Sequence, residues 1–371
     1  MLGNLGIRLN LLIGKTVPVP ASSDLINALT KVEVTNDADS GDGFQLTFVM
    51  SKGRLFEYNL LQSGSVDPFT RVIVSVSVGV IPRVLIDGII THHQINPNGD
   101  QGNPTITVSG KDVSIMMDLK EKNDEFKNQP DSLIVTNIIK SYAGYGLTPL
   151  PAPTAIIPLE TERITKQQET DFKFIQKLAE RNGFIFYVEP QTVGVNKAYW
   201  GPASRTGLPQ PALTMNMGSY TNISSINFSY DSLAPIGTEG SFIEPINKTR
   251  IPIPVLPSLK VPPLCLLPAQ PRKTVLLRDT AKKDAAQAAE NSVSAILNTP
   301  DSISGDGELD TIKYGHVLRA RNLVGVRGVG ISYDGLYYVK KVTHNFSQGI
   351  YKQQFSISRE GLVALSPVLE I

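Results

Sequence analysis

The stretch that most constrains the fold is residues 161–189, TERITKQQETDFKFIQKLAERNGFIFYVE. Thr170 can cap a helix, because its hydroxyl can accept a hydrogen bond from a free N–H of the first turn, and Asp171 suits the positive end of the helix dipole. Asn182 and Gly183 end the helix, since glycine adopts the left-handed conformation after the last turn without steric strain. We therefore expect a strand-like entry, a helix, a sharp stop and a second strand.

The two faces of this helix differ in polarity. Apolar residues three and four apart make one stripe, formed by Phe172, Ile175, Leu178 and Ala179. The polar side is predicted to carry Lys173, Lys177, Glu180 and Arg181. The following run at 184–188 is aromatic and β-branched throughout, which is typical of a covered strand. On physical grounds alone this is an α/β packing unit that many classes of protein could contain.

Residues 1–118 have the pattern of an all-β region. Apolar and polar residues alternate in short runs that are rich in β-branched side chains. The separators are rich in glycine, aspartate, asparagine and proline, which favour turns. We expect strands at 9–13, 31–36, 44–49, 71–78, 84–90 and 105–110. Short, closely spaced strands of this kind indicate a small barrel or sandwich, so residues 1–118 are predicted to form a first β-barrel domain.

Residues 119–250 are predicted to form a mixed α/β domain that contains the helix and strand described above. Another helix is expected at 131–142, with an apolar side formed by Leu133, Ile134, Ile138 and Ile139. Prolines punctuate residues 149–158, which we expect to be extended, and residues 222–230 have the pattern of a strand.

Residues 251–272 are interpreted as a proline-rich connector. The stretch IPIPVLPSLKVPPLCLLPAQP at 251–271 holds seven prolines. Because proline fixes φ and donates no backbone hydrogen bond, neither a helix nor a central strand can form there. Apolar residues lie between the prolines, so we expect the connector to lie along a surface of this protein or of a partner.

Residues 273–371 are predicted to form a helix and a second β-barrel domain. The segment 279–297 is rich in alanine, opens with Asp279 and closes before Pro300, which favours a helix. After it we expect strands at 315–320, 330–333, 336–342 and 351–358.

The two β regions share an order of features. Asp-Gly, a strand, Thr-His, a polar loop and a last strand occur in both, so that Asp87 matches Asp334 and Thr91 matches Thr343. The spacings differ, however, and turns are built from few residue types. Chance resemblance therefore stands beside duplication as an interpretation.

A second echo is the tetrapeptide Ser-Gly-Asp-Gly, which occurs at 40–43 and 304–307. If the two regions are duplicates, a trimer would present six similar barrels, which would match a hexameric tube to a trimeric tip. The predicted fold is thus β-rich α+β, with two similar small antiparallel β-barrel domains and an inserted mixed α/β domain, assembling as a trimeric pseudo-six-fold ring.

Charge and cysteine content argue against several classes of function. Thirty-five Lys and Arg balance 34 Asp and Glu, a net charge of +1, so we expect neither nucleic-acid binding nor attraction to an anionic membrane. Cys265 is the only cysteine, which leaves no internal disulfide and suits a reducing compartment. Arg8 and Asn10 interrupt the apolar N-terminal stretch, so no secretion signal is predicted, and no run reaches the ~18 apolar residues of a membrane helix.

The search for chemistry finds no site. The four histidines are at positions 92, 93, 316 and 344. His92 and His93 would point to opposite faces of a strand, and no ligand-spaced partners accompany them, so no metal site is predicted. The glycine-rich segment 325–330 opens no helix that could hold a phosphate, and Cys265 lacks the basic surroundings of a reactive thiol. We predict no catalytic, cofactor-binding or metal-binding residues, and no enzyme.

Two stretches resemble a known family. The run ETDFKFIQKLAERNGFIFY at 169–187 is similar to the signature helix and strand of the phage late-control D family. That family includes the baseplate hub proteins of contractile phage tails and the hub part of VgrG-type secretion spikes. The order Gly-x-Tyr-x-Val, His, aromatic and Arg within 334–359 resembles the closing strands of the same family.

This resemblance implies a structural baseplate hub of a contractile injection machine, in a phage tail or a phage-derived particle. The hub would be a homotrimer that contacts an inner tube protein, a spike protein and other baseplate proteins. It would be made in the cytoplasm and built into a particle. The second β region is followed at once by Ile371, so the spike is expected to be a separate protein, and the apolar segment 362–371 is expected to dock on it.

An alternative class of function is a carbohydrate- or peptidoglycan-binding module. Such a module would expose several aromatic side chains in a groove, and Trp200 is the only tryptophan.

Overall fold

A computed structural model describes residues 6–15, 17–51, 58–79, 81–98, 103–161, 164–243, 249–253, 260–276, 297, 299–347 and 349–365 of the chain. Its α-helices are α1 (Ser23–Ala28), α2 (Asn59–Gln62), α3 (Asp131–Lys140), α4 (Asp171–Asn182) and α6 (Thr311–Tyr314). The 3-10 helices among these residues are η2 (Val113–Met117), η3 (Ala143–Tyr145) and η4 (Gly218–Tyr220).

Strands dominate the chain. The first half holds β1 (Ile7–Gly14), β2 (Val19–Pro20), β3 (Leu29–Asp37), β4 (Gly43–Val49), β5 (Arg71–Val78), β6 (Ile81–Asn96), β7 (Thr105–Asp112), β8 (Asp124–Phe126), β9 (Leu147–Pro151), β10 (Thr165–Gln167), β11 (Ile185–Thr192) and β12 (Val195–Gly201). The second half holds β13 (Gln210–Thr214), β14 (Ile223–Tyr230), β15 (Ile236–Ile243), β16 (Arg250–Ile253), β17 (Cys265–Pro268), β18 (Lys273–Leu276), β19 (Ile303–Asp310), β20 (Leu323–Arg327), β21 (Gly335–Ser347), β22 (Ile350–Arg359) and β23 (Gly361–Ala364).

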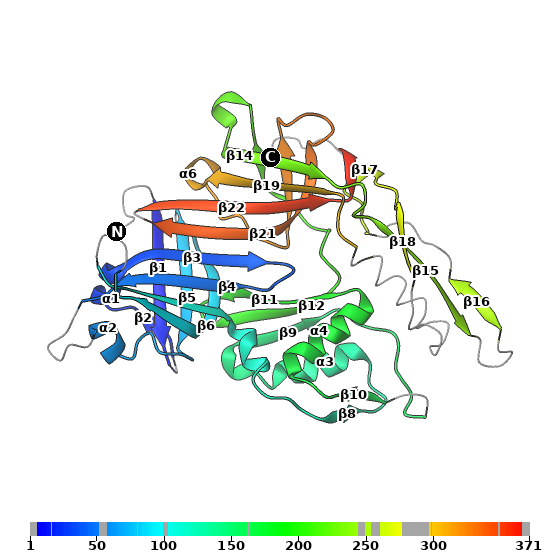
Figure 1. Ribbon diagram of the computed structural model, residues 1–371, viewed down its shortest axis with the longest axis horizontal. Coiled ribbons are helices and arrows are strands. Elements are labelled where there is room, and N and C mark those ends of the chain that lie inside the picture. Colours follow the sequence, from blue (N-terminus) through cyan, green and yellow to red (C-terminus); the bar gives the residue numbers. More distant parts are fainter. Residues whose placement is uncertain are drawn as a thin grey trace.

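One 13-stranded sheet forms the body of the molecule (Figure 1). It consists of two runs of six strands with the same order, followed from edge to edge. The first run is β3-β4-β7-β6-β5-β1, with β2 added beyond β1, and the second is β14-β19-β22-β21-β20-β13. Strands at matching positions of the two runs also have the same rank in chain order, so that β3 and β14, for example, are each the second strand of their run. The runs differ at their far ends, where β1 is antiparallel to β5 but β13 is parallel to β20.

Two β-bulges fall at matching places in the two runs. The ladder of β6 with β7 shifts between Ile90 and His92, and the ladder of β21 with β22 shifts between Val339 and Lys341. Counting across the sheet from these bulges makes Phe48 of β4 the equivalent of Leu309 of β19. The ladder of β3 with β4 shifts just after the pair that contains Phe48, and the ladder of β14 with β19 shifts just after the pair that contains Leu309. These two shifts therefore match as well. The two runs are therefore structural equivalents of each other.

The residues that suggested duplication from the sequence are not the ones that match. The bulge residue Thr91 corresponds to Lys340, not to Thr343. The first Ser-Gly-Asp-Gly spans the turn before β4 and ends at Gly43, the first residue of that strand, whereas the second, at 304–307, lies inside β19. Strand order and bulges carry the repeat, because backbone pairing constrains them more strongly than it constrains surface side chains.

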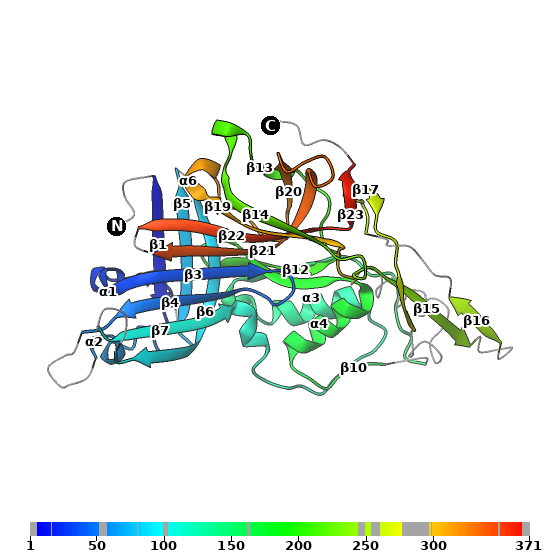
Figure 2. The same cartoon turned by 45° about the horizontal axis from the view of Figure 1, so that its top comes forward.

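A single strand joins the two runs. The first part of β21 pairs with β20, through Gly335 to Tyr338, and its later part pairs antiparallel with β3, from Lys341 opposite Asp37 to Ser347 opposite Lys31. Figure 2 shows β22, β21, β3, β4 and β7 as successive strands of one surface. The sheet is thus continuous across the two halves of the chain.

The middle segment, which we define as residues 113–201, packs its helices α3 and α4 on a three-stranded sheet ordered β11-β12-β9. Thr170 caps α4 by accepting from the Lys173 N–H, and Gly183 ends it with φ of 66°, as predicted. Figure 1 places this segment beside β6 and below the large sheet.

The buried faces of the two helices differ by a residue from the predicted ones. In α4 the fully buried phenylalanine is Phe174, which stacks on Phe126 with ring centroids 5.6 Å apart, while Phe172 is half-buried. In α3 Val135 is buried, and Leu133, predicted to be apolar-facing, is exposed. Side-chain spacing alone could not choose between neighbouring positions, because the contact with β8 and β9 sets the rotation of each helix.

The strand predictions succeed in the first run and partly fail in the second. Residues 315–320 are irregular, because the backbone N–H groups of Leu318 and Arg319 are bonded by the side-chain oxygens of Gln353 and Gln210 and need no partner strand. Residues 330–333 form a turn before β21. The predictions missed β19, whose glycines suggested a turn, and β20.

The connector and the helix predicted after it are covered only in part. β17 pairs with β23, so this part of the connector lies on the protein's own surface. The pair is two-stranded, which suits proline at an edge. The helix predicted at 279–297 lies outside the described residues apart from its last position. β15, β16 and β18 extend away from the body in Figure 1.

Candidate functional site

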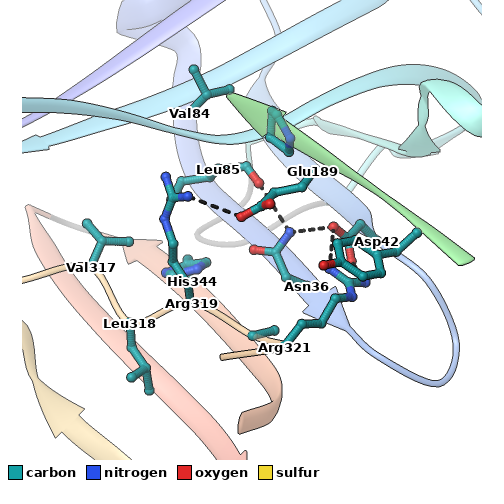
Figure 3. Close-up of a pocket in the computed structure, with 13 residues that line it drawn as sticks. Asn36, Asp42, Val84, Leu85, Glu189, Val317, Leu318, Arg319, Arg321 and His344 are labelled. Atoms are coloured by element: carbon teal, nitrogen blue, oxygen red, sulfur yellow. Dashed lines mark hydrogen bonds and ion pairs between the residues drawn. The ribbon is translucent and has the colours of Figure 1, made fainter. Parts of the chain in front are cut away.

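Three parts of the chain meet at a buried ion pair (Figure 3). Arg321, just before β20, donates to Asp42 from Nη2 at 2.5 Å and from Nη1 at 3.2 Å. Its guanidinium lies 4.4 Å from the ring centroid of Tyr187 on β11. Asn36 on β3 donates to Asp42 as well, at 2.9 Å. The first run, the second run and the middle segment are therefore tied together by one charged group.

Burial shapes the charges of this junction. Burial alone would lower the pKa of Arg321, but the Asp42 carboxylate raises it above its ordinary value. Asp112 at the end of β7 is buried, and burial together with the nearby Asp42 raises its pKa to about 6. The Asp112 carboxylate accepts a hydrogen bond from the Ser114 N–H at 2.8 Å.

A second ion pair closes the other side of the junction. Arg319 donates to Glu189 on β11 at 3.2 Å. Burial lowers the pKa of Arg319 although Glu189 opposes this. His344 on β21 is buried beside it and bonds the Tyr351 hydroxyl through Nδ1 at 2.8 Å. Burial and the Arg319 charge lower the pKa of His344 to about 3, so the ring is neutral at physiological pH.

The junction lines a partly open cavity of about 30 Å³. Pockets that hold small-molecule ligands measure roughly 300–1,000 Å³. The charged groups around the cavity also pair with one another, in Arg321–Asp42 and Arg319–Glu189. The arrangement therefore suits the locking of three packed units rather than the binding of a substrate.

A second buried cluster fixes the connector to the sheet. Arg205 donates to Glu360 at 2.6 Å and to Asp301 at 3.2 Å, and Lys260 of the connector donates to Asp301 at 2.7 Å. Burial lowers the pKa of Lys260. Burial would raise the pKa of Asp301, but Lys260 and Arg205 hold it below its usual value.

The residues considered for chemistry are scattered. His92 and His316 are exposed, His93 is half-buried and His344 lies at the junction. Burial raises the pKa of the Cys265 thiol to about 12, which keeps it protonated and unreactive. Within the described ranges, no three His, Cys, Asp or Glu side chains gather where they could hold a metal ion.

Trp200 is also unavailable to a ligand. Its ring is fully buried, packs edge-on against Phe184 and donates from Nε1 to the Ile175 carbonyl at 3.2 Å. The described part of the chain contains no helix that is both long and apolar enough to cross a membrane.

An apolar patch, which we call the ribbon patch, surrounds the pair β17–β23. Its exposed side chains are Val261, Leu266, Leu267 and Leu365. Leu266, Leu267 and Leu365 are 55%, 63% and 54% exposed. Several large exposed aliphatic side chains on and beside one short pair of strands favour a contact with another protein.

Comparison with known proteins gives a fold. A family model described as the Alg8 N-terminal domain matches residues 57–209, less than half of the chain. No curated protein matches the sequence. The late-control D assignment is not confirmed by a family model and stays a prediction.

Solved structures match over nearly the whole chain. The tail protein from Neisseria meningitidis MC58 has a TM-score of 0.66 at 13% identity, covering 96% of this chain and 98% of that one. The 43 kDa tail protein of prophage MuSo2 from Shewanella oneidensis has a TM-score of 0.60 at 14% identity, with 95% and 98% covered.

A third structure is the E. coli c3393 protein. It is described as a component of the type VI secretion system with structural similarity to the T4 bacteriophage tail proteins gp27 and gp5. Its TM-score is 0.55 at 12% identity, with 92% of this chain and 77% of that one covered. The chain therefore shares the fold of phage tail proteins and of a secretion-system component, and the expected β-rich antiparallel architecture with few helices is confirmed.

Proposed function

We propose that this protein is the structural hub of a contractile injection particle, in which a homotrimer joins a hexameric inner tube to a trimeric spike. The fold shared with tail proteins and with a type VI secretion component supports a role in such a particle. Its partners would be the inner tube protein, a separate spike protein and other baseplate proteins.

The observation that carries this proposal is the repeat of six strands within one chain. Three copies of the chain hold six equivalent runs, which can present six similar surfaces to a hexameric tube. The middle segment and the projecting strands β15, β16 and β18 occur once in each chain, and so three times in the trimer. One chain can thus meet six-fold symmetry on one face and three-fold symmetry on the other.

The junction around Asp42 and Arg321 suits a rigid structural part of a particle. A buried Arg–carboxylate pair fixes geometry because either charge would be costly to leave alone in the interior. It holds the two strand runs and the middle segment in one arrangement. The ribbon patch supports docking of the spike, because it offers apolar side chains next to the segment whose end was expected to contact that protein.

The symmetry of the purified chain tests this function. Light scattering and averaged electron micrographs would be recorded for the chain alone and with its tube and spike proteins. We expect a three-fold ring with an axial channel and six density lobes on one face. A chain that remains monomeric with both partners present would overturn the hub proposal.

A further inference from the structure

The pairing of β21 with β3 shows how two strand runs join. Seven residue pairs connect them, from Lys341 opposite Asp37 to Ser347 opposite Lys31. On the inner face this joint covers Val32, Val34 and His344, which are 2%, 0% and 1% exposed. On the other face the hydroxyls of Thr35 and Thr343 lie 3.3 Å apart and share a hydrogen bond.

The strands equivalent to β21 and β3 in the other run each have an edge without a partner strand among the described residues. By the matching bulges, β6 beyond Ile90 corresponds to the part of β21 that pairs with β3, and β14 corresponds to β3. Within the described residues, residues 92–96 of β6 pair only with β7, and β14 pairs only with β19. Each end of the molecule thus presents one half of the joint that is complete in its middle.

Side chains at these two edges are more exposed than the equivalent side chains of the β21–β3 joint, as expected of edges that lack a partner. Ile95 occupies the position of His344 but is 37% exposed instead of 1%. Ile226 and Phe228 occupy the positions of Val32 and Val34 and are half-buried instead of covered. His93 is a further indication of a missing partner, because its Nδ1 is buried without a hydrogen-bond partner within the described residues.

We propose that the open edge of β6 in one copy of this chain pairs antiparallel with the open edge of β14 in the next copy. Transfer of the internal register places His93 opposite Tyr230, Gln94 opposite Ser229 and Ile95 opposite Phe228. Asn96 then lies opposite Asn227. The partner is a second copy of the chain, and the inference rests on the proposed ring.

The chemistry of the transferred pairs suits this joint. Ile95 and Phe228 form an aliphatic–aromatic cross-strand pair on the inner face, which adds to the stability of a sheet. Gln94 and Ser229 repeat on the other face the polar pair made by Thr343 and Thr35. The two edges differ from each other, so the contact is head-to-tail, and a head-to-tail contact closes into a ring or grows without end.

Disulfide trapping tests the register. In the double variant H93C/Y230C, oxidation should convert most chains of the trimer fraction into covalently linked dimers and trimers, with no larger species. In the matched control Q94C/Y230C the two thiols would point to opposite faces, and at least tenfold less linkage is expected. Cys265 is buried and does not compete.

A charged substitution tests the same edge without cysteines. Ile95→Lys should be tolerated in the free chain, where the position is partly exposed, and should abolish the trimer by placing an unpaired charge against Phe228. Gln94→Lys, on the opposite face, should leave the trimer intact. Far-ultraviolet circular dichroism and the thermal midpoint would show that both variants are folded.

The outcomes separate this inference from the hub proposal. Linkage in H93C/Y230C well above that in Q94C/Y230C, together with loss of the trimer in Ile95→Lys alone, supports the edge pairing. A trimer that shows no register-specific linkage and survives Ile95→Lys overturns the edge pairing and leaves the hub standing. A chain that never forms a trimer overturns both.

Discussion

At the scale of the residue, the contacts that unite the molecule could not be read from the sequence. Asp42 and Arg321 are 279 positions apart, and each looks like an ordinary solvated charge in its local segment. Burial of both depends on three segments that pack together only in the folded chain. Local signals did identify Thr170 and Gly183 correctly, because helix caps depend on neighbouring backbone alone.

The Asp112 carboxyl gives the junction a defined response to pH. Its folded pKa is about 6, against 3.8 for the ordinary group. The folded state therefore holds this proton more tightly, which stabilises it below about pH 4. That contribution is lost as pH rises to about 6, and the shift corresponds to roughly 3 kcal/mol at most.

The variant Asp112→Asn should remove this response, since its amide oxygen can still accept from the Ser114 N–H. We expect the free energy of unfolding of the variant, measured with denaturant from pH 4 to pH 7, to exceed that of the wild type increasingly as pH rises. His344 titrates in both proteins and drops out of the difference. Parallel pH profiles would contradict the role assigned to Asp112.

At the scale of the element, alternation of apolar residues predicted the first run well and the second run less well. The strand expected at 71–78 coincides with β5, because its β-branched residues alternate without interruption. The sequence pattern did not predict β19, because Gly305 and Gly307 are typical turn residues. In the structure the rings of Phe228 and Phe355 cover these glycines, so neighbouring strands supply the apolar surface that the strand itself lacks.

Gly307→Ala should expose this dependence. A Cβ at this position would lie 2.4 Å from the Ser225 carbonyl oxygen and 2.6 Å from the Phe355 ring, which forces β14 or β22 to shift. We expect a loss of about 1–3 kcal/mol in the free energy of unfolding, measured with denaturant. Gly144→Ala is the control, because its Cβ would meet nothing within 4 Å, and equal effects of the two changes would refute the packing argument.

At the scale of the whole molecule, the sequence indicated a repeat, but with the wrong residues. Strand order and bulges revealed it because they record backbone geometry, whereas side chains at matching positions, such as Thr91 and Lys340, differ. The middle segment, in contrast, was recognisable in advance because its helix carries its own start, stripe and stop.

Docking of the spike on the ribbon patch can be tested with substitutions rather than a long deletion. Removal of 362–371 would take away most of β23, which pairs with β17, so a loss of binding could reflect damage to the fold. We expect the double variant Leu267→Asp/Leu365→Asp to lower co-purification of the spike protein at least tenfold. Val193→Asp, equally exposed in the turn between β11 and β12, should leave it unchanged, and retention of the spike by the double variant would disprove this docking site.

The joint between β21 and β3 has a consequence for counting. Because each chain carries two strand runs already fastened together, a closed head-to-tail ring of this protein can hold only an even number of runs. A ring of five or seven strand runs cannot form, because each chain adds two runs. Half of the seams in such a ring also form as the chain folds, so that dilution can open only the other half.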